Sequence, residues 1–216
     1  MDILEIMKAR HSVRQYSGIK IENGIKEALT ALVSECNRES GLHIQIIFDE
    51  PKCFDSMMAH YGKFSGVENY IALVGKKDTA LDEKAGYYGE KLVLKAQELG
   101  LNTCWVAMTH GKSAAEIKKG EKLACIIALG YGVTQGIVHK DKPMEQLCNC
   151  ASAMPDWFSK GMEAVLLAPT AMNQQKFYFT LENGKVAVRA GKGFYTKMDL
   201  GIVKYHFESV TGRKVE

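Results

Sequence analysis

Two arginines and a serine stand close together near the start of the chain, at Arg10, Ser12 and Arg14. An arginine side chain presents a planar fork of N–H donors, and a serine hydroxyl adds one more donor. Charge-assisted hydrogen bonds from several directions suit a phosphate monoester, so this segment predicts an anion site. The alternative is a solvated cationic turn, because clustered arginines on protein surfaces commonly contact only water.

A run of small and amide-bearing residues occupies positions 168–175, with the sequence APTAMNQQ. Small residues let a flat ligand approach the backbone, and the amides of Asn173, Gln174 and Gln175 offer paired donors and acceptors. A heterocycle with carbonyl and ring-nitrogen edges needs such groups. An ordinary loop between a helix and a strand is the alternative interpretation.

A third candidate segment, residues 101–108, begins as an apolar strand and continues into a loop. Backbone N–H groups beyond the end of a strand can hydrogen-bond a redox-active ring nitrogen and stabilise the reduced, anionic ring. The alternative interpretation of Trp105 is an ordinary core residue.

The composition limits the class of protein. The chain has 216 residues, 46% hydrophobic and 25% charged, which is typical of a globular protein and excludes a collagen or a disordered chain. The net charge of +3 is spread along the chain, so no nucleic-acid partner is expected. The longest apolar stretches are far shorter than a membrane-spanning helix, and the first residues lack the pattern of a secretory signal. We expect a cytoplasmic protein with no membrane partner.

The six cysteines contain no C-x-x-C pair and are interpreted as reduced thiols. Cys148 and Cys150 form the only close pair, and their spacing fits neither a zinc site nor thioredoxin-type chemistry. No metal is expected. No side chain in the three candidate segments is an obvious nucleophile, so no catalytic side chain is assigned.

Helical spacing and apolar runs indicate the elements that position the three segments. Helices are expected over residues 3–10, 24–38, 78–99 and 154–168, and from residue 198 onward. Strands are expected over residues 43–48, 69–75, 103–108 and 123–129. A hairpin is expected in which residues 176–181 and 186–188 flank an Asn-Gly turn.

A weak internal repeat relates residues 86–91 to residues 201–206, at an offset of about 115 residues. This offset suits duplication of a half-domain, and chance similarity is the alternative. We expect a first half over residues 1–150 and a second half over residues 151–216, which together form one compact unit.

The three segments, together with Gly130-Tyr131-Gly132 and the basic stretch at residues 140–143, resemble the nitroreductase-type FMN flavoproteins. The resemblance is to a divergent branch of that family with internal pseudo-twofold symmetry. It implies an α+β fold in which helices flank a central, mainly antiparallel sheet and two halves are pseudo-symmetric.

The resemblance also implies the cofactor, FMN, and its ligands. The R-x-S-x-R segment would hold the phosphate and ribityl chain, and a basic pair would complete the phosphate site. The strand-end loop would place an N–H group near flavin N5, and the late loop would cover the isoalloxazine ring. The implied cofactor-binding residues are Arg10, His11, Ser12, Arg14, Trp105, Val106, Ala107, Met108, Lys140, Lys142, Pro169, Thr170, Ala171, Asn173 and Gln175.

One departure from the usual family pattern bears on the oligomeric state. Usual members carry the A-P-S-A-x-N-x-Q loop soon after the R-x-S-x-R helix, and they form homodimers in which this loop reaches the partner's flavin. Residues 34–38 of this chain do not match that loop, and the matching loop lies in the second half. We therefore expect one flavin per chain, in a monomer that acts as a pseudo-dimer.

The implied activity is NAD(P)H-driven reduction of nitroaromatics, quinones or similar electron-poor acceptors, by ping-pong hydride transfer through flavin N5. NAD(P)H and a small-molecule acceptor are the expected partners. One alternative is a non-catalytic protein of the same fold that stores or senses FMN. Another is a structural α+β protein without a cofactor.

Overall fold

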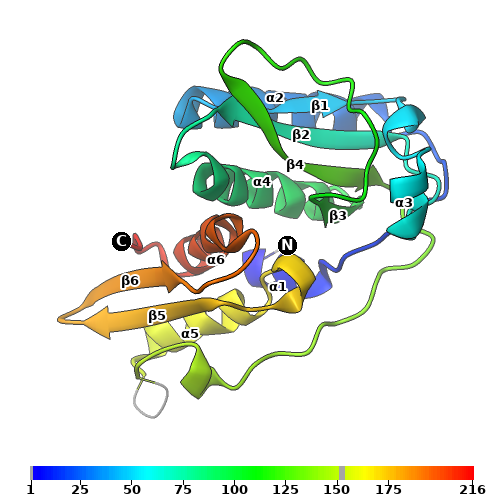
Figure 1. The fold of residues 1–216 in the computed structure, drawn as a ribbon. Helices are drawn as coiled ribbons and strands as arrows, with labels where there is room; N and C mark the ends of the chain where they lie inside the picture. Colours follow the sequence, from blue (N-terminus) through cyan, green and yellow to red (C-terminus); the bar gives the residue numbers. More distant parts are fainter. Residues whose placement is uncertain (1, 151–153) are drawn as a thin grey trace. The chain divides into compact units, whose positions relative to one another are not determined.

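The computed structural model describes residues 2–150 and 154–216, and the chain divides into two compact units (Figure 1). The sheet unit consists of Ala9–Leu81 and Lys91–Ile137, and the hairpin unit consists of Met1–Lys8, Asp82–Glu90 and Val138–Glu216. The boundary expected between residues 150 and 151 adjoins residues 151–153, which lie outside the described residues. The pseudo-symmetric halves therefore stay a prediction.

The sheet unit is built on four antiparallel strands in the order β1 (Gln45–Ile47), β2 (Asn69–Lys76), β4 (Glu121–Gly130) and β3 (Asn102–Val106). Helix α2 (Asn23–Ser40) runs alongside β1 (Figure 1). Strand β2 is buried along its length except at Lys76, as expected of a central strand covered on both faces. The predicted antiparallel sheet flanked by helices is confirmed.

Strand β3 ends earlier than the apolar pattern predicts. Its pairing with β4 stops at Val106 opposite Ile126, and Met108 is 68% exposed. Residues beyond Val106 do not pair with β4, so the apolar run continues into a loop. The expectation of a strand to residue 108 was therefore wrong by two residues.

A short helix that the sequence pattern did not indicate, α3 (Met57–Tyr61), follows the turn η1 (Pro51–Cys53). The Ser56 hydroxyl accepts a hydrogen bond from the Ala59 N–H, which caps this helix. The neighbouring core contains Phe54, Phe64 and Tyr70 in edge-on and tilted ring contacts. The loop after β3 is docked to this core, because the Tyr70 hydroxyl accepts the Ala114 N–H at 2.8 Å.

The hairpin unit contains the expected β-hairpin, formed by β5 (Phe177–Glu182) and β6 (Lys185–Ala190). Its turn residues Asn183 and Gly184 both have positive φ, 51° and 76°. A two-residue turn of this kind matches the right-handed twist of the strands, which is why Asn-Gly favours it. The prediction of a hairpin at this position is confirmed.

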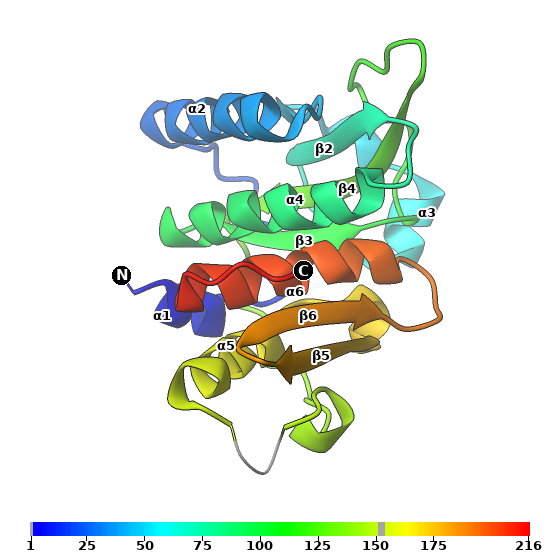
Figure 2. The same cartoon turned by 90° about the vertical axis from the view of Figure 1, so that its left-hand side faces the viewer.

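Helices α5 (Asp156–Leu166) and α6 (Thr196–Thr211) complete the core of the hairpin unit, with α6 running along the hairpin (Figure 2). The rings of Phe158 and Phe179 both contact Phe207, with centroids 5.5 and 5.3 Å away. Two short turns, η2 (Met144–Gln146) and η3 (Ala171–Asn173), belong to the same unit. The short helix α1 (Ile3–Ala9) contributes its first residues to this unit.

Helix α4 (Leu81–Glu98) contributes its first turns to the hairpin unit and packs there against α6. Gly86 and Gly201 face each other at this crossing, and a Cβ atom added to Gly86 would lie 3.2 Å from the Gly201 Cα. Farther along the same crossing, the Glu90 carboxylate lies 2.9 Å from His206 Nε2. The two segments that the weak repeat relates therefore meet in the folded chain.

Candidate functional site

In the sheet unit, the R-x-S-x-R segment lies beside strand β3. Ser12 pairs with Thr103 in a parallel bridge, and the Val13 N–H donates to the Thr103 carbonyl at 3.0 Å. On its other side the Arg14 carbonyl accepts the Ser65 N–H at 3.0 Å. The backbone of the segment is therefore held on both sides.

Arg10, Ser12 and Arg14 all lie near one buried thiol in β3, that of Cys104. Burial raises the pKa of Cys104, whereas Arg14, a hydrogen bond with Ser12 and then Arg10 act to lower it. Arg10 is only 3% exposed, while Ser12 and Arg14 are exposed. The Arg14 guanidinium also lies 5.9 Å from the centre of the Phe64 ring. The three predicted phosphate ligands thus share one electropositive region.

The chain that follows β4 bonds to Asn102 at the start of β3 and to Gln15, the residue after the R-x-S-x-R segment. The Gly132 N–H donates to Asn102 Oδ1 at 2.9 Å, and the Val133 N–H donates to the Gln15 carbonyl at 2.9 Å. A Cβ atom at Gly132 would lie 2.8 Å from both Asn102 Oδ1 and a Val13 methyl group. Close packing therefore requires glycine at the second glycine position of the Gly-Tyr-Gly motif, Gly132.

The strand-end residues 105–108 adjoin this region through β3. Val106 is buried, Trp105 and Ala107 are half-buried, and Met108 is exposed. The next residue, Thr109, approaches the end of α3, because a Cβ atom at Gly62 would lie 2.6 Å from the Thr109 side chain. Met108 therefore lies in a loop that runs along α3.

In the hairpin unit, the amides of the late loop bond mainly to the chain itself. The Asn173 and Gln175 side-chain amides both donate to the Lys140 carbonyl at 2.8 Å. Gln175 Oε1 accepts the Lys142 N–H at 2.9 Å, and Gln175 is 4% exposed. The sequence suggested that the amides of residues 173–175 could hydrogen-bond the edge of a heterocycle. In the structure, those of Asn173 and Gln175 join the loop to residues 140–142.

Lys142 is also used within the hairpin unit. Its ammonium donates to the Gln174 carbonyl at 2.7 Å and to the Gln175 carbonyl at 3.2 Å. The side chain of Lys140, in contrast, is exposed. Of the two basic residues predicted for a phosphate, Lys142 holds the loop in this structure and Lys140 extends into solvent.

A residue that the sequence did not single out, Asp199, anchors the same loop from the first turn of α6. Its Oδ1 accepts the Ala171 N–H at 2.9 Å, and its Oδ2 accepts Gln174 Nε2–H at 2.7 Å. Burial raises the pKa of Asp199 from 3.8 to about 6, against the opposing effect of these two donors. An acidic residue in the first turn of a helix is too common a pattern to reveal this contact.

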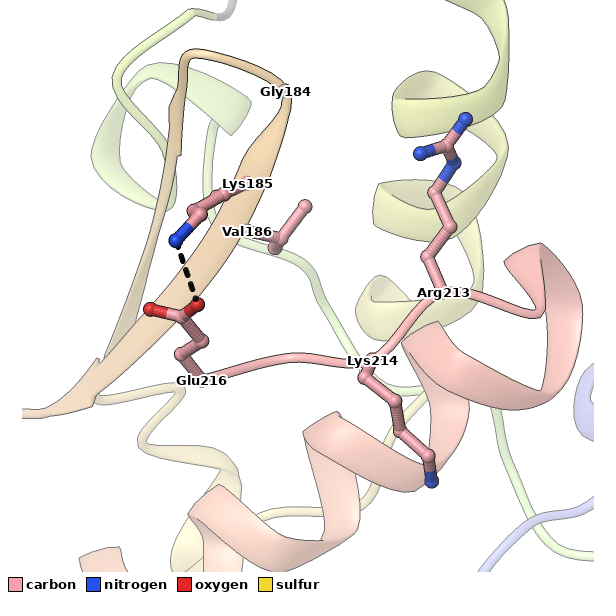
Figure 3. A pocket seen from close by; sticks show the side chains of 6 residues that line it. All are labelled: Gly184, Lys185, Val186, Arg213, Lys214 and Glu216. Carbon is pink, nitrogen blue, oxygen red and sulfur yellow. Dashed lines mark ion pairs between the residues drawn. The ribbon is translucent and has the colours of Figure 1, made fainter.

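A hollow of about 240 Å³ lies elsewhere in the hairpin unit and involves no predicted site residue (Figure 3). Its three cations are directed to different partners. Lys185 pairs with Glu216 at 3.7 Å, Lys214 pairs with Glu208 at 2.7 Å, and Arg213 lies 4.0 Å from the centre of the Trp157 ring. The three cations of this hollow are therefore not arranged to bind one anion together.

The folded chain thus groups the predicted residues in two sets. The sheet unit brings residues 10–14 together with residues 105–108, and the hairpin unit brings residues 140–142 together with residues 169–175. A family model described as "Putative TM nitroreductase" matches residues 2–211. The chain belongs to this family. Its members are nitroreductase-type proteins, which makes this chain part of an oxidoreductase family.

Solved structures share the nitroreductase fold. A protein described as a "putative nitroreductase" from Thermotoga maritima is 23% identical, with a TM-score of 0.74, over 99% of this chain and 87% of that one. One from Desulfovibrio desulfuricans, crystallised in complex with FMN, is 17% identical, with a TM-score of 0.52, over 67% and 94%. A "putative NADH oxidase" from Clostridium acetobutylicum is 18% identical, with a TM-score of 0.50, over 66% and 96%. No curated protein matches the chain.

Within residues 2–150 and 154–216, no helix has the length and apolar character needed to span a bilayer. The same part of the chain contains no group of three or more His, Cys, Asp or Glu side chains arranged to hold a metal ion.

Proposed function

We propose that this nitroreductase-family protein is an FMN-dependent oxidoreductase that uses NAD(P)H to reduce nitroaromatics, quinones or similar electron-poor acceptors. Membership of the family supports the class of reaction. The Desulfovibrio desulfuricans neighbour that contains FMN supports the choice of cofactor, and the neighbour described as an NADH oxidase supports the choice of reductant.

The observation that carries the proposal is that Arg10, Ser12 and Arg14 all lie near Cys104, in the segment that pairs with β3 at Thr103. Two guanidinium groups and a hydroxyl supply the donors that a phosphate dianion requires. Backbone hydrogen bonds at Val13, Arg14 and Gln15 fix the main chain from which these donors extend, which lowers the cost of ordering them around an anion. The donor set therefore fits the phosphate end of FMN.

The other assigned residues are proposed to hold the remainder of the cofactor. His11 would contact the ribityl phosphate through its backbone, and Lys140 would add a further positive charge. The backbone of Trp105, Val106, Ala107 and Met108 would donate a hydrogen bond at flavin N5 and hold the charge of the reduced ring. The loop of Pro169, Thr170, Ala171, Asn173 and Gln175 would cover the ring, with one FMN per chain and no dimer required.

The bound FMN would supply hydride transfer at N5, from NAD(P)H and then to the acceptor. Residues of the chain would orient the ring, exclude water from one face and leave the other face accessible to both substrates in turn. Lys142 has a supporting role in this proposal, because its ammonium is already bonded to the loop that covers the ring.

The direct test is an FMN titration of the purified chain, followed by NADH and NADPH oxidation with menadione or nitrofurazone as acceptor. We expect one FMN per chain and acceptor-dependent turnover. Arg14→Ala should weaken FMN binding by about tenfold to a hundredfold, since it removes a charge-assisted contact. The exposed arginine of α2 in the same unit provides the matched control, Arg38→Ala, which should bind FMN normally.

The results separate the proposal from its alternatives. One FMN bound per chain without turnover under any reductant would favour a storage or sensor protein. A chain that binds no FMN would contradict the cofactor assignment. The phosphate assignment alone would be wrong if two variants, Arg14→Ala and the double variant Arg10→Ala, Arg14→Ala, both bound FMN normally with unchanged far-ultraviolet circular dichroism.

A further inference from the structure

The loop of residues 169–175 has an unfavourable backbone conformation. Met172, Asn173 and Gln175 have φ values of 51°, 51° and 44°, in the left-handed region that side chains other than glycine rarely adopt. Asparagine tolerates this region, but methionine and glutamine gain nothing from it locally. Met172 is also 83% exposed, so burial of its side chain does not stabilise the turn. Contacts from outside the turn must hold it.

Asp199 makes two of these contacts, one on each side of Met172 and Asn173. Its Oδ1 accepts the N–H of Ala171, just before the left-handed pair, and its Oδ2 accepts an amide hydrogen of Gln174, just after it. The other amide hydrogen of Gln174 is donated to the Phe194 carbonyl at 2.8 Å. A single carboxylate therefore spans the strained pair and fixes both of its ends.

The carboxylate is itself held firmly. Asp199 is 3% exposed, and its N–H donates to the Tyr195 carbonyl at the start of α6. Both of its partners in the loop are N–H donors, which an ionised carboxylate satisfies at both oxygens. A neutral side chain at this position would leave one donor poorly paired, because a carboxylic acid or an amide also carries hydrogens of its own.

We propose that Asp199 is a positioning residue for FMN, whose carboxylate holds the strained turn at Met172 and Asn173 in the conformation that covers the cofactor ring. This inference rests on the proposed function, because it assigns Asp199 a role in presenting the loop that would contact FMN. In this proposal Asp199 acts through the loop and does not itself contact the cofactor.

The test compares the unaltered chain with Asp199→Asn and Asp199→Leu. Asparagine retains one acceptor of similar shape, and leucine retains none. The matched control is Asp156→Asn, which alters an exposed aspartate in the first turn of α5 in the same unit. Three quantities are measured: FMN affinity by fluorescence quenching, visible circular dichroism of bound FMN, and amide hydrogen exchange of residues 169–175 in the chain without added FMN.

We expect Asp199→Asn to weaken FMN binding about tenfold and Asp199→Leu to weaken it further, since one and then both bonds to the turn are lost. The visible circular dichroism of bound FMN should change in both variants, and exchange of residues 169–175 should accelerate in the same order. Asp156→Asn should match the unaltered chain in all three measurements. A purely structural role for Asp199 would lower thermal stability without changing the spectrum of bound FMN.

Two results would overturn the proposal while leaving the proposed function intact. One is FMN binding by Asp199→Leu with unaltered affinity and spectrum, and the other is an equal loss in Asp156→Asn. If neither Asp199 variant folds, Gln174→Ala removes one bond from the loop side and should still weaken FMN binding and change its spectrum; unchanged binding would overturn the proposal. An unaltered chain that binds no FMN would overturn the proposed function itself.

Discussion

The crossing of α4 and α6 at Gly86 and Gly201 gives a prediction that does not depend on any cofactor. A Cβ atom at Gly201 would overlap the Glu83 carbonyl oxygen and approach the Tyr87 nitrogen at 2.6 Å. Both obstacles are backbone atoms of a helix, so no side chain can rotate away to make room. Gly201→Ala therefore requires the two helices to separate.

The expected cost follows from two opposing effects. Overpacking costs about 1–3 kcal/mol in well-packed cores, and a contact with rigid backbone belongs at the upper end of that range or above it. Alanine in a helix interior stabilises the helix by up to about 1 kcal/mol relative to glycine. We expect a net loss of about 2–3 kcal/mol in the free energy of unfolding, which in a chain of this length lowers Tm by about 5–10 °C.

Urea denaturation and thermal scans of Gly201→Ala measure this loss. The matched control is Gly24→Ala in α2, where an added Cβ atom meets nothing within 4 Å. It should be neutral or stabilise the chain by at most about 1 kcal/mol. Gly201→Ala with the stability of Gly24→Ala would refute the close helix crossing. A Gly86→Ala, Gly201→Ala double variant should lose less than the two single losses together, because one separation of the helices relieves both overlaps.

Three further predictions concern buried or bonded polar groups. His206→Ala should lower the free energy of unfolding by about 3–5 kcal/mol in chemical denaturation, because it removes a partner of Glu90 and both residues of this pair are 0% exposed. The Glu90→Leu, His206→Leu double variant should recover much of this loss. Burial raises the pKa of Asp199 from 3.8 to about 6, so ionising this carboxyl in the fold costs free energy that the two N–H donors of the loop only partly offset, and the chain should lose stability as the pH rises through about 6. The stability of the unaltered chain relative to Asp199→Asn should therefore fall by on the order of 3 kcal/mol between about pH 4 and about pH 7, and a flat difference would contradict the raised pKa. Lys142→Met should accelerate amide exchange at residues 174–176, whereas Lys140→Met, which changes an exposed neighbour, should not.

Much of the architecture followed from local pattern. The apolar run of β2, the Asn-Gly turn of the hairpin and the stripes of α2 and α4 each depend on residues close together in the chain. Their periodicity therefore predicted the elements, although the ends of β3 and α5 differed by a few residues. Helix α3 was missed because its five residues are too few to establish a helical period.

The candidate segments were also visible in the sequence, but the roles of individual residues within them were not. Arg10, Ser12 and Arg14 lie close together in the chain, and the structure brings them to one region beside Cys104. Lys142, by contrast, has the residue type of a phosphate ligand and holds the backbone of a loop more than thirty positions away. Whether an ammonium is available to a ligand depends on which carbonyl groups the fold places near it.

The amino-acid sequence by itself determined the antiparallel strands, the hairpin turn and the segments that carry the family resemblance, because each depends on the spacing of neighbouring residues. Only the tertiary structure decided that Asp199 spans a strained turn and that Gly86 meets Gly201. These contacts join residues separated by tens of positions or more, and their energies depend on distances of a few ångströms. Such distances are set by the packing of whole elements, which local pattern does not specify.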